Sequence, residues 1–221
     1  MRKKKSLALE VEVAGLNFAN PVGLTQGAEG LKKCHLWAPK AGFVVATPPK
    51  ENLIDWITKL QDFTQQGVIA VNLRSDIVRT FSLLYDFAHF IIIDPDTNNG
   101  IRSADISDMT ELIDEIVSLR LCYERYTPIF LRLSHAETPD ELHPLCSYAR
   151  LSGLDGLVAP DPDRVRMTLQ ECQHRVPVIG VAQNAETALE ELQDGASLVQ
   201  TDLSSLALGK LLKTLEKPSQ E

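Results

Sequence analysis

The sequence predicts an α/β fold of the single (β/α)8 barrel type. Eight short runs of apolar, largely β-branched residues recur along the 221-residue chain, separated by segments with the apolar spacing of helices. The runs are mainly apolar instead of alternating regularly with polar residues, which is typical of parallel strands covered on both faces. Because eight comparable β–α units close naturally into a barrel and leave little chain for long loops, we expect one domain over residues 1–221.

The strands are expected in regular succession. Residues 7–18 (LALEVEVAGLNF) form an amphipathic segment that suits a hairpin plugging the bottom of the barrel. The eight barrel strands are predicted at residues 21–25, 42–47, 67–73, 90–94, 128–133, 154–160, 176–182 and 196–202.

The intervening segments carry helix signals. Residues 108–126 (DMTELIDEIVSLRLCYERY) place apolar side chains at helical spacing. Thr138 is a candidate N-cap followed by proline and acidic residues, and Asn184 is a second candidate, with Gly195 as the stop of its helix. An open doubly wound sheet is the alternative, but eight comparable strands and an opening hairpin favour closure.

Composition narrows the class of function. The net charge of −8 argues against a nucleic-acid partner, which would need a surplus of Lys and Arg on one face. Residues 1–5 (MRKKK) are interpreted as a disordered tail, and no apolar run is long enough for a membrane span, so we expect a soluble, cytoplasmic protein. The four cysteines form no CxxC pair and the five histidines lack metal-ligand spacing, so we predict reduced thiols and no metal site.

The strand sequences and their order resemble the dihydroorotate dehydrogenase family of FMN-dependent barrels in pyrimidine biosynthesis. The likeness runs from EVEVAGLNFANPVGLT (10–25) through VIAVNL (68–73) and DPDTNNGIR (94–102) to VPVIGV (176–181) and DGASLVQTDLSSLALG (194–209). The first and last of these stretches are its specific parts. The chain is therefore interpreted as a shortened, divergent member of this family.

The resemblance implies where a flavin would lie. It assigns cofactor-binding positions, in vestigial form, to Gly27, Thr47, Asn72, Arg132 and Gly180. Arg132 stands where the family has a lysine near the flavin; an arginine there keeps the positive charge and can hold an anion or pair with Asp94.

The catalytic positions are changed. The family's first strand delivers a lysine to the flavin, and this chain has Gly30 in that place. The proton-abstracting Ser or Cys becomes Asp94, and a substrate-binding asparagine becomes Asp96. Aspartate can act as a base, but these acids can equally form a hydrogen-bonded turn with Asn98 and Asn99.

The phosphate end is altered as well. The family's G-V-G-G turn is GVAQ here, so the side chains of Ala182 and Gln183 would crowd the phosphate nest. Asp202 adds a negative charge beside the phosphate position, which is unfavourable without a bridging metal.

Three functions follow from these observations. The first is a catalytically inactive relative without cofactor, acting as a scaffold or as a partner subunit in a homo- or hetero-oligomer with an active relative. The second is an active FMN-dependent oxidoreductase of the dihydroorotate dehydrogenase type. The third is a binder of another small ligand at the barrel mouth, built around Asp94, Asp96, Arg132 and Asp202.

Overall fold

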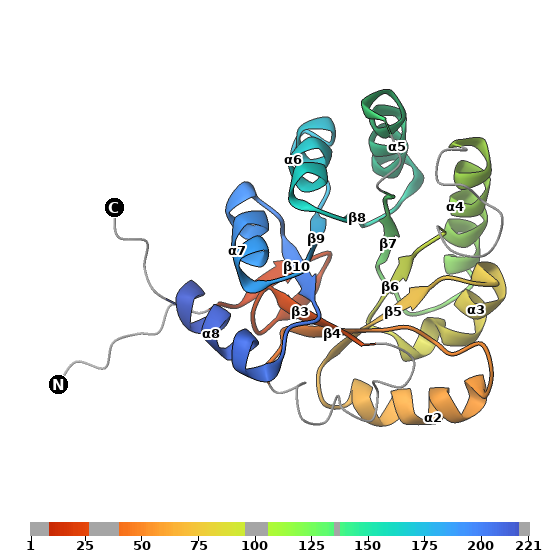
Figure 1. The fold of residues 1–221 in the computed structure, drawn as a ribbon. Helices are drawn as coiled ribbons and strands as arrows, with labels where there is room; N and C mark the ends of the chain where they lie inside the picture. The colour runs from red at the N-terminus through yellow and green to blue at the C-terminus, as the bar shows by residue number, and fades with distance from the viewer. Residues whose placement is uncertain (1–8, 27–39, 96–105, 135–137, 217–221) are drawn as a thin grey trace.

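The computed structural model describes residues 9–26, 40–95, 106–134 and 138–216. A closed barrel of eight parallel strands is wrapped by helices, which confirms the predicted fold class (Figure 1). All eight predicted strands are present, with bounds that differ from the predictions by one or two residues. They are β3 (Val22–Gln26), β4 (Phe43–Ala46), β5 (Val68–Leu73), β6 (Phe90–Ile93), β7 (Ile129–Arg132), β8 (Gly156–Ala159), β9 (Val178–Ala182) and β10 (Leu198–Thr201).

The barrel is closed by the pairing of its last strand with its first. Strand β10 pairs in parallel with β3, with Val199 opposite Val22 and Gln200 opposite Gly23, and also with β9. Since each strand has two neighbours, the open doubly wound sheet is excluded.

The predicted hairpin closes the amino-terminal end of the barrel. Strands β1 (Val11–Val13) and β2 (Leu16–Phe18) pair antiparallel through a turn at residues 14–15, both with positive φ. The ring of Phe18 lies 5.6 Å from that of Phe43 and 6.0 Å from that of Phe90, measured between centroids. Because Phe43 and Phe90 begin their strands, the hairpin fills the end opposite the carboxyl ends of the strands.

The described helices form the outer layer. They are α2 (Leu53–Thr64), α3 (Ile77–Leu84), α4 (Ile106–Arg120), α5 (Pro139–Ser152), α6 (Pro162–Glu171), α7 (Ala185–Asp194) and α8 (Ser205–Leu215), with a 3-10 turn at Tyr85–Phe87. The predicted caps are confirmed: Thr138 and Glu141 form a reciprocal capping box, and Asn184 accepts a bond from the Thr187 N–H. Gly195 ends α7 with a φ of 109°.

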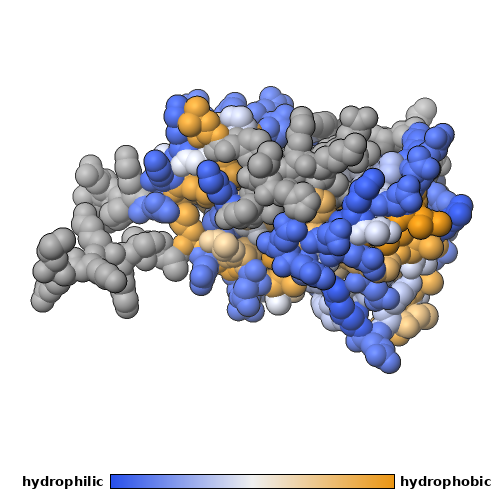
Figure 2. Space-filling model, turned by 90° about the horizontal axis from the view of Figure 1, so that it is seen from below, coloured by the Kyte–Doolittle hydropathy of each residue, from blue (hydrophilic) through white to orange (hydrophobic). Residues whose placement is uncertain are grey.

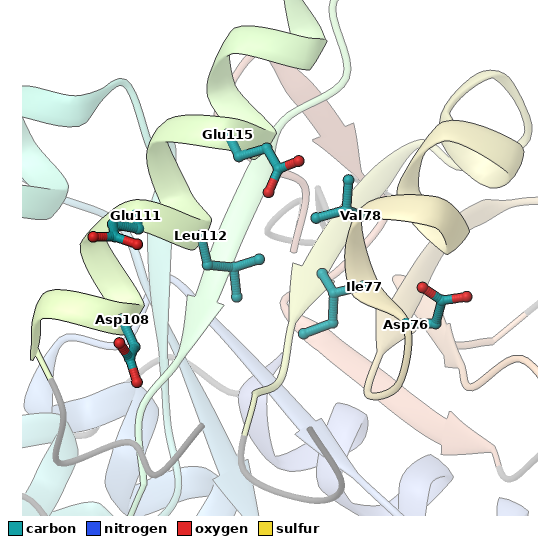
Figure 3. A pocket seen from close by; sticks show the side chains of 7 residues that line it. All are labelled: Asp76, Ile77, Val78, Asp108, Glu111, Leu112 and Glu115. Atoms are coloured by element: carbon teal, nitrogen blue, oxygen red, sulfur yellow. The ribbon is translucent and has the colours of Figure 1, made fainter. Parts of the chain in front are cut away.

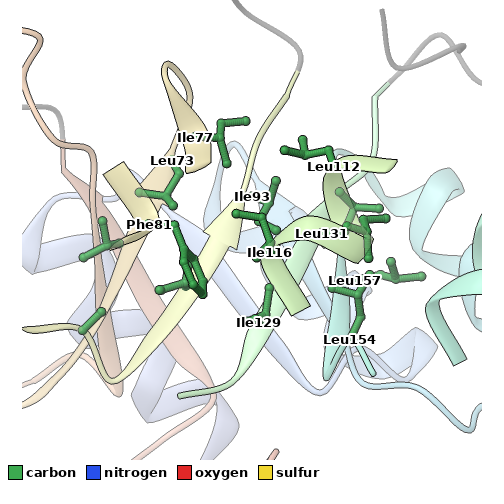
Figure 4. Packing of buried hydrophobic residues seen from close by; sticks show 14 of the residues in the cluster. Leu73, Ile77, Phe81, Ile93, Leu112, Ile116, Ile129, Leu131, Leu154 and Leu157 are labelled. Atoms are coloured by element: carbon green, nitrogen blue, oxygen red, sulfur yellow. The ribbon is translucent and has the colours of Figure 1, made fainter. Parts of the chain in front are cut away.

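Two apolar layers account for strands that are hydrophobic throughout. Phe43, Phe90 and Phe130 belong to the cluster inside the barrel. Their neighbours Val44 and Ile91 belong to the cluster between barrel and helices, part of which appears in Figure 4. Every residue of such a strand is therefore buried on one face or the other.

Candidate functional site

Three polar side chains lie at the carboxyl ends of adjacent strands, beyond the apolar residues that fill the barrel interior. Side chains alternate along a strand, so Asn72, Asp94 and Arg132 point inward, two residues beyond the interior residues of β5, β6 and β7. In barrels of this type the carboxyl ends carry the functional groups. The structure thus brings together three of the residues singled out in the sequence.

Asp94 is held by its neighbours on both sides. Its Oδ2 accepts hydrogen bonds from Arg74 Nε at 2.9 Å and from Asn72 Nδ2 at 3.3 Å. Arg132 Nε lies 3.7 Å from the same oxygen, so the expected Arg132–Asp94 ion pair is present. The Asp94 side chain is only 3% exposed. Its carboxylate thus bonds across strands β5 and β7, whereas the turn that we considered with Asp96, Asn98 and Asn99 lies outside the described residues.

Arg74 is the residue of this cluster that sequence reasoning missed. It follows Asn72 by two positions, directly after β5, so the period-two rule places it on the same inward-facing side. Its side chain remains 42% exposed, which leaves part of the guanidinium open to solvent beside the buried carboxylate.

The remaining predicted positions are spread around the mouth. Thr47 is half-buried just after β4, and Asp202 is exposed after β10. Gly27 and Asp96 lie outside the described residues.

Gly180 faces away from the mouth. A Cβ added there would lie 2.3 Å from Glu191 Oε2, so this glycine permits close packing of α7 on β9. Glu191 is fully buried, and burial raises its pKa to about 8. The negative charges of Asp161, Glu190 and Asp194 act in the same direction.

The carboxyl ends of β9 and β10 fit an FMN phosphate poorly. In the helices that follow, one backbone donor each is already bonded to a capping side chain: Asn184 Oδ1 accepts from Thr187 N at 2.9 Å, and Ser204 Oγ accepts from Ala207 N at 3.4 Å. The exposed carboxylate of Asp202 lies between Thr201 and the Ser204 cap. A phosphate dianion would meet fewer free donors and an added negative charge.

Two amide oxygens in the barrel have no hydrogen-bond partner among the described residues. They are Asn72 Oδ1 and Gln200 Oε1, and both side chains are buried. Buried polar atoms are nearly always bonded, so these two oxygens favour a donor that the described protein atoms do not supply.

A separate acidic groove lies between α3 and α4. Figure 3 shows Leu112 and Glu115 of α4 pointing toward Ile77 and Val78 of α3. The groove has a volume of about 620 Å³, and its carboxylates come from Asp76, Asp108, Glu111 and Glu115. Across the described part of the chain, no group of three His, Cys, Asp or Glu side chains has an arrangement that would hold a metal ion.

Comparison with known proteins agrees with the family resemblance of the sequence. The dihydroorotate dehydrogenase (quinone) of Aeromonas hydrophila subsp. hydrophila is 24% identical over 273 aligned positions, which include 86% of this chain and 80% of that protein. The enzyme of the same name from Bartonella henselae is 22% identical, covering 74% of this chain and 60% of that protein. The chain is a distant homologue of the dihydroorotate dehydrogenases. No sequence model of a known protein family matches it.

Solved structures support the fold. The dihydroorotate dehydrogenase of Eimeria tenella in complex with ferulenol superimposes with a TM-score of 0.75 at 17% identity, covering 96% of this chain and 83% of that one. A mandelate oxidase variant with an FMN adduct has a TM-score of 0.66 at 13% identity. The 273 positions aligned with the Aeromonas enzyme exceed the 221 residues of this chain, so that enzyme carries segments that this chain lacks.

Proposed function

We propose that this chain is a catalytically inactive, dihydroorotate dehydrogenase-like barrel that acts in the cytoplasm as a scaffold or partner subunit, without a bound flavin. The observation that carries the proposal is the state of Asp94, at the position of the family's base. A general base needs an accessible lone pair directed at the substrate. Asp94 Oδ2 is instead bonded to Arg74 and Asn72, beside Arg132, and the side chain is almost completely buried.

The charge balance at the mouth supports the same function. Two arginines surround one buried carboxylate, and removing one partner of a buried pair is strongly unfavourable. Asp94 therefore has a structural role in tying β5, β6 and β7 together. This structural role is sufficient to account for an aspartate at this position, without any contact between Asp94 and a substrate.

The phosphate end adds an independent argument. Gly180, the surviving glycine of the family's phosphate turn, packs against Glu191 on the outer side of β9. Asn184 and Ser204 cap the helices after the last two strands. These features account for the residues in this region without a flavin.

A partner would have to use a surface of mixed character. Seen from below, hydrophobic residues appear toward both ends of the face in Figure 2, among hydrophilic residues. Ile54 and Leu206 are both more than two-thirds exposed. No described helix has the length and apolar character needed to cross a membrane.

The test is turnover of dihydroorotate by the purified protein, with FMN and an artificial electron acceptor supplied. The Aeromonas hydrophila enzyme serves as the positive control. We expect no oxidation above background, and Asp94→Asn should leave that background unchanged. Turnover that disappears in Asp94→Asn but persists in Asp202→Asn would overturn the proposal and identify Asp94 as the base of an active enzyme.

A second function, binding of another small ligand at the mouth, is favoured by the amide oxygens of Asn72 and Gln200, which have no hydrogen-bond partner among the described residues. Such a ligand would present hydrogen-bond donors to these oxygens and an anionic group to Arg74. Thermal-shift screening of small anions against the protein and its Arg74→Ala variant tests it. Stabilisation of the parent protein that the variant lacks would support this function over the scaffold.

A further inference from the structure

Two cysteines that are far apart in the sequence meet between helices α5 and α6. Cys146 lies within α5 and Cys172 follows the last residue of α6; both are reduced cysteines, and both are completely buried. Their side chains hydrogen-bond to each other. Because no CxxC motif links them, the sequence alone gives no sign of this contact.

The surroundings favour the thiolate form of one partner. The hydrogen bond from Cys146 lowers the pKa of Cys172, and the positive charge of Arg150 acts in the same direction. Burial and the charge of Glu171 oppose this shift. The carboxylate of Glu171 also lies 2.6 Å from His143 Nδ1, so a second contact joins α5 to the end of α6 beside the thiols.

We propose that Cys146 and Cys172 form a redox-active pair that a peroxide converts reversibly into an intramolecular disulfide. The Cys172 thiolate attacks one peroxide oxygen, and the O–O bond breaks to give a sulfenic acid and water or an alcohol. The Cys146 sulfur then attacks the sulfenic sulfur, the S–O bond breaks, and water leaves. Two thiols lose two hydrogen atoms in total, and one peroxide is reduced.

Disulfide formation requires the two sulfur atoms to approach to about 2.05 Å, with a suitable torsion about the new bond. The chain after Cys172 is a tight turn in which Gln173 and His174 both have a φ of 53°, a conformation that side chains other than glycine rarely adopt. Cys172 is thus on the border between a regular helix and a strained turn, where local opening can admit an oxidant.

The experiment uses the full chain carrying Cys34→Ser and Cys122→Ser, so that only the pair remains. The protein is treated with hydrogen peroxide under native conditions, and its peptides are mapped by mass spectrometry without reduction. We expect a linked peptide containing Cys146 and Cys172, with a mass lower by two hydrogen atoms than the two free peptides together. Reduction with dithiothreitol should remove the link, and the oxidised form should melt at a higher temperature than the reduced form.

Two results would overturn the proposal. One is oxidation of either thiol to sulfinic or sulfonic acid without a link. The other is full retention of both free thiols under conditions that oxidise a small thiol completely. Both results are measured on the protein that retains Cys146 and Cys172, so the conclusion does not depend on whether further variants fold. Cys146→Ser and Cys172→Ser then serve as controls in which the linked peptide must be missing.

Discussion

Replacing Glu191 with glutamine is expected to change how the stability of the protein depends on pH. Glu191 is completely buried on α7 against Gly180, and neither carboxylate oxygen has a hydrogen-bond partner among the described residues. Burial, assisted by nearby acids, raises its pKa from 4.5 to about 8. The folded protein therefore keeps a proton on Glu191 at neutral pH, whereas the unfolded chain releases it.

The sign and size follow from proton linkage. A carboxyl group with a raised folded pKa contributes its full stability below the unfolded value of 4.5 and loses it as the pH rises toward about 8. Each pKa unit corresponds to about 1.4 kcal/mol, so the loss reaches about 3 kcal/mol at neutral pH. Glutamine cannot ionise, so the Glu191→Gln variant should lack this loss.

The assay is urea unfolding of the parent protein and the variant between about pH 5 and about pH 7. The amide of the variant is also unpaired, and that cost is the same at every pH, so the informative quantity is the change in the difference between the two proteins. We expect the variant to gain about 2–3 kcal/mol relative to the parent over this range. Glu186→Gln, an exposed position in the first turn of the same helix, is the matched control and should follow the parent. Parallel curves for the parent and Glu191→Gln would refute the reasoning.

Three other substitutions test the packing of the barrel, each by urea unfolding. Gly180→Ala places a Cβ 2.3 Å from Glu191 Oε2 and should lower the free energy of unfolding by about 1–3 kcal/mol. The control is Gly209→Ala, where an added Cβ has no atom within 4 Å and should be neutral or stabilising by up to about 1 kcal/mol. Equal effects of the two substitutions would contradict the close packing of α7 on β9. Asp94→Ala leaves two arginines without their shared carboxylate and should cost about 2–3 kcal/mol, and a change below about 0.5 kcal/mol would show that the cluster is not structural. Arg120→Met removes bonds of 2.8 Å to Asp155 and 2.7 Å to the Gly153 carbonyl and should cost about 3 kcal/mol, and full stability in that variant would indicate that solvent replaces both bonds.

The strands could be predicted because their signal is local. A strand of a helix-wrapped barrel is buried on both faces, so runs such as residues 90–93 (FIII) are apolar throughout and can be recognised without knowledge of the rest of the fold. Capping residues such as Thr138 and Asn184 are equally local, since the capped N–H groups lie within three residues.

The contacts between elements could be predicted only in part. Asp94 and Arg132 were paired correctly because the family resemblance placed both at neighbouring strand ends, but Arg74 required the period-two rule to be continued past the end of its strand. In ALEELQD, Glu190 and Glu191 are identical in chemistry; only their positions around the helix decide that Glu191, three residues after the buried Ala188, faces the barrel.

The contact between Cys146 and Cys172 could not be predicted from sequence patterns. Cys146 and Cys172 belong to different helices, and their contact depends on how α5 and α6 pack on the barrel. Spacing rules detect cysteines that are close in the chain, and these two are not.

The most direct test of the central claim is the flavin content of the purified protein after saturation with FMN and removal of unbound cofactor. The measured quantity is the absorbance of the flavin band relative to that of the protein. Because Asp94 is engaged by arginines and the phosphate end is capped, we predict no band above that of a control protein without a flavin site. One FMN retained per chain would contradict the account and show that the barrel binds flavin.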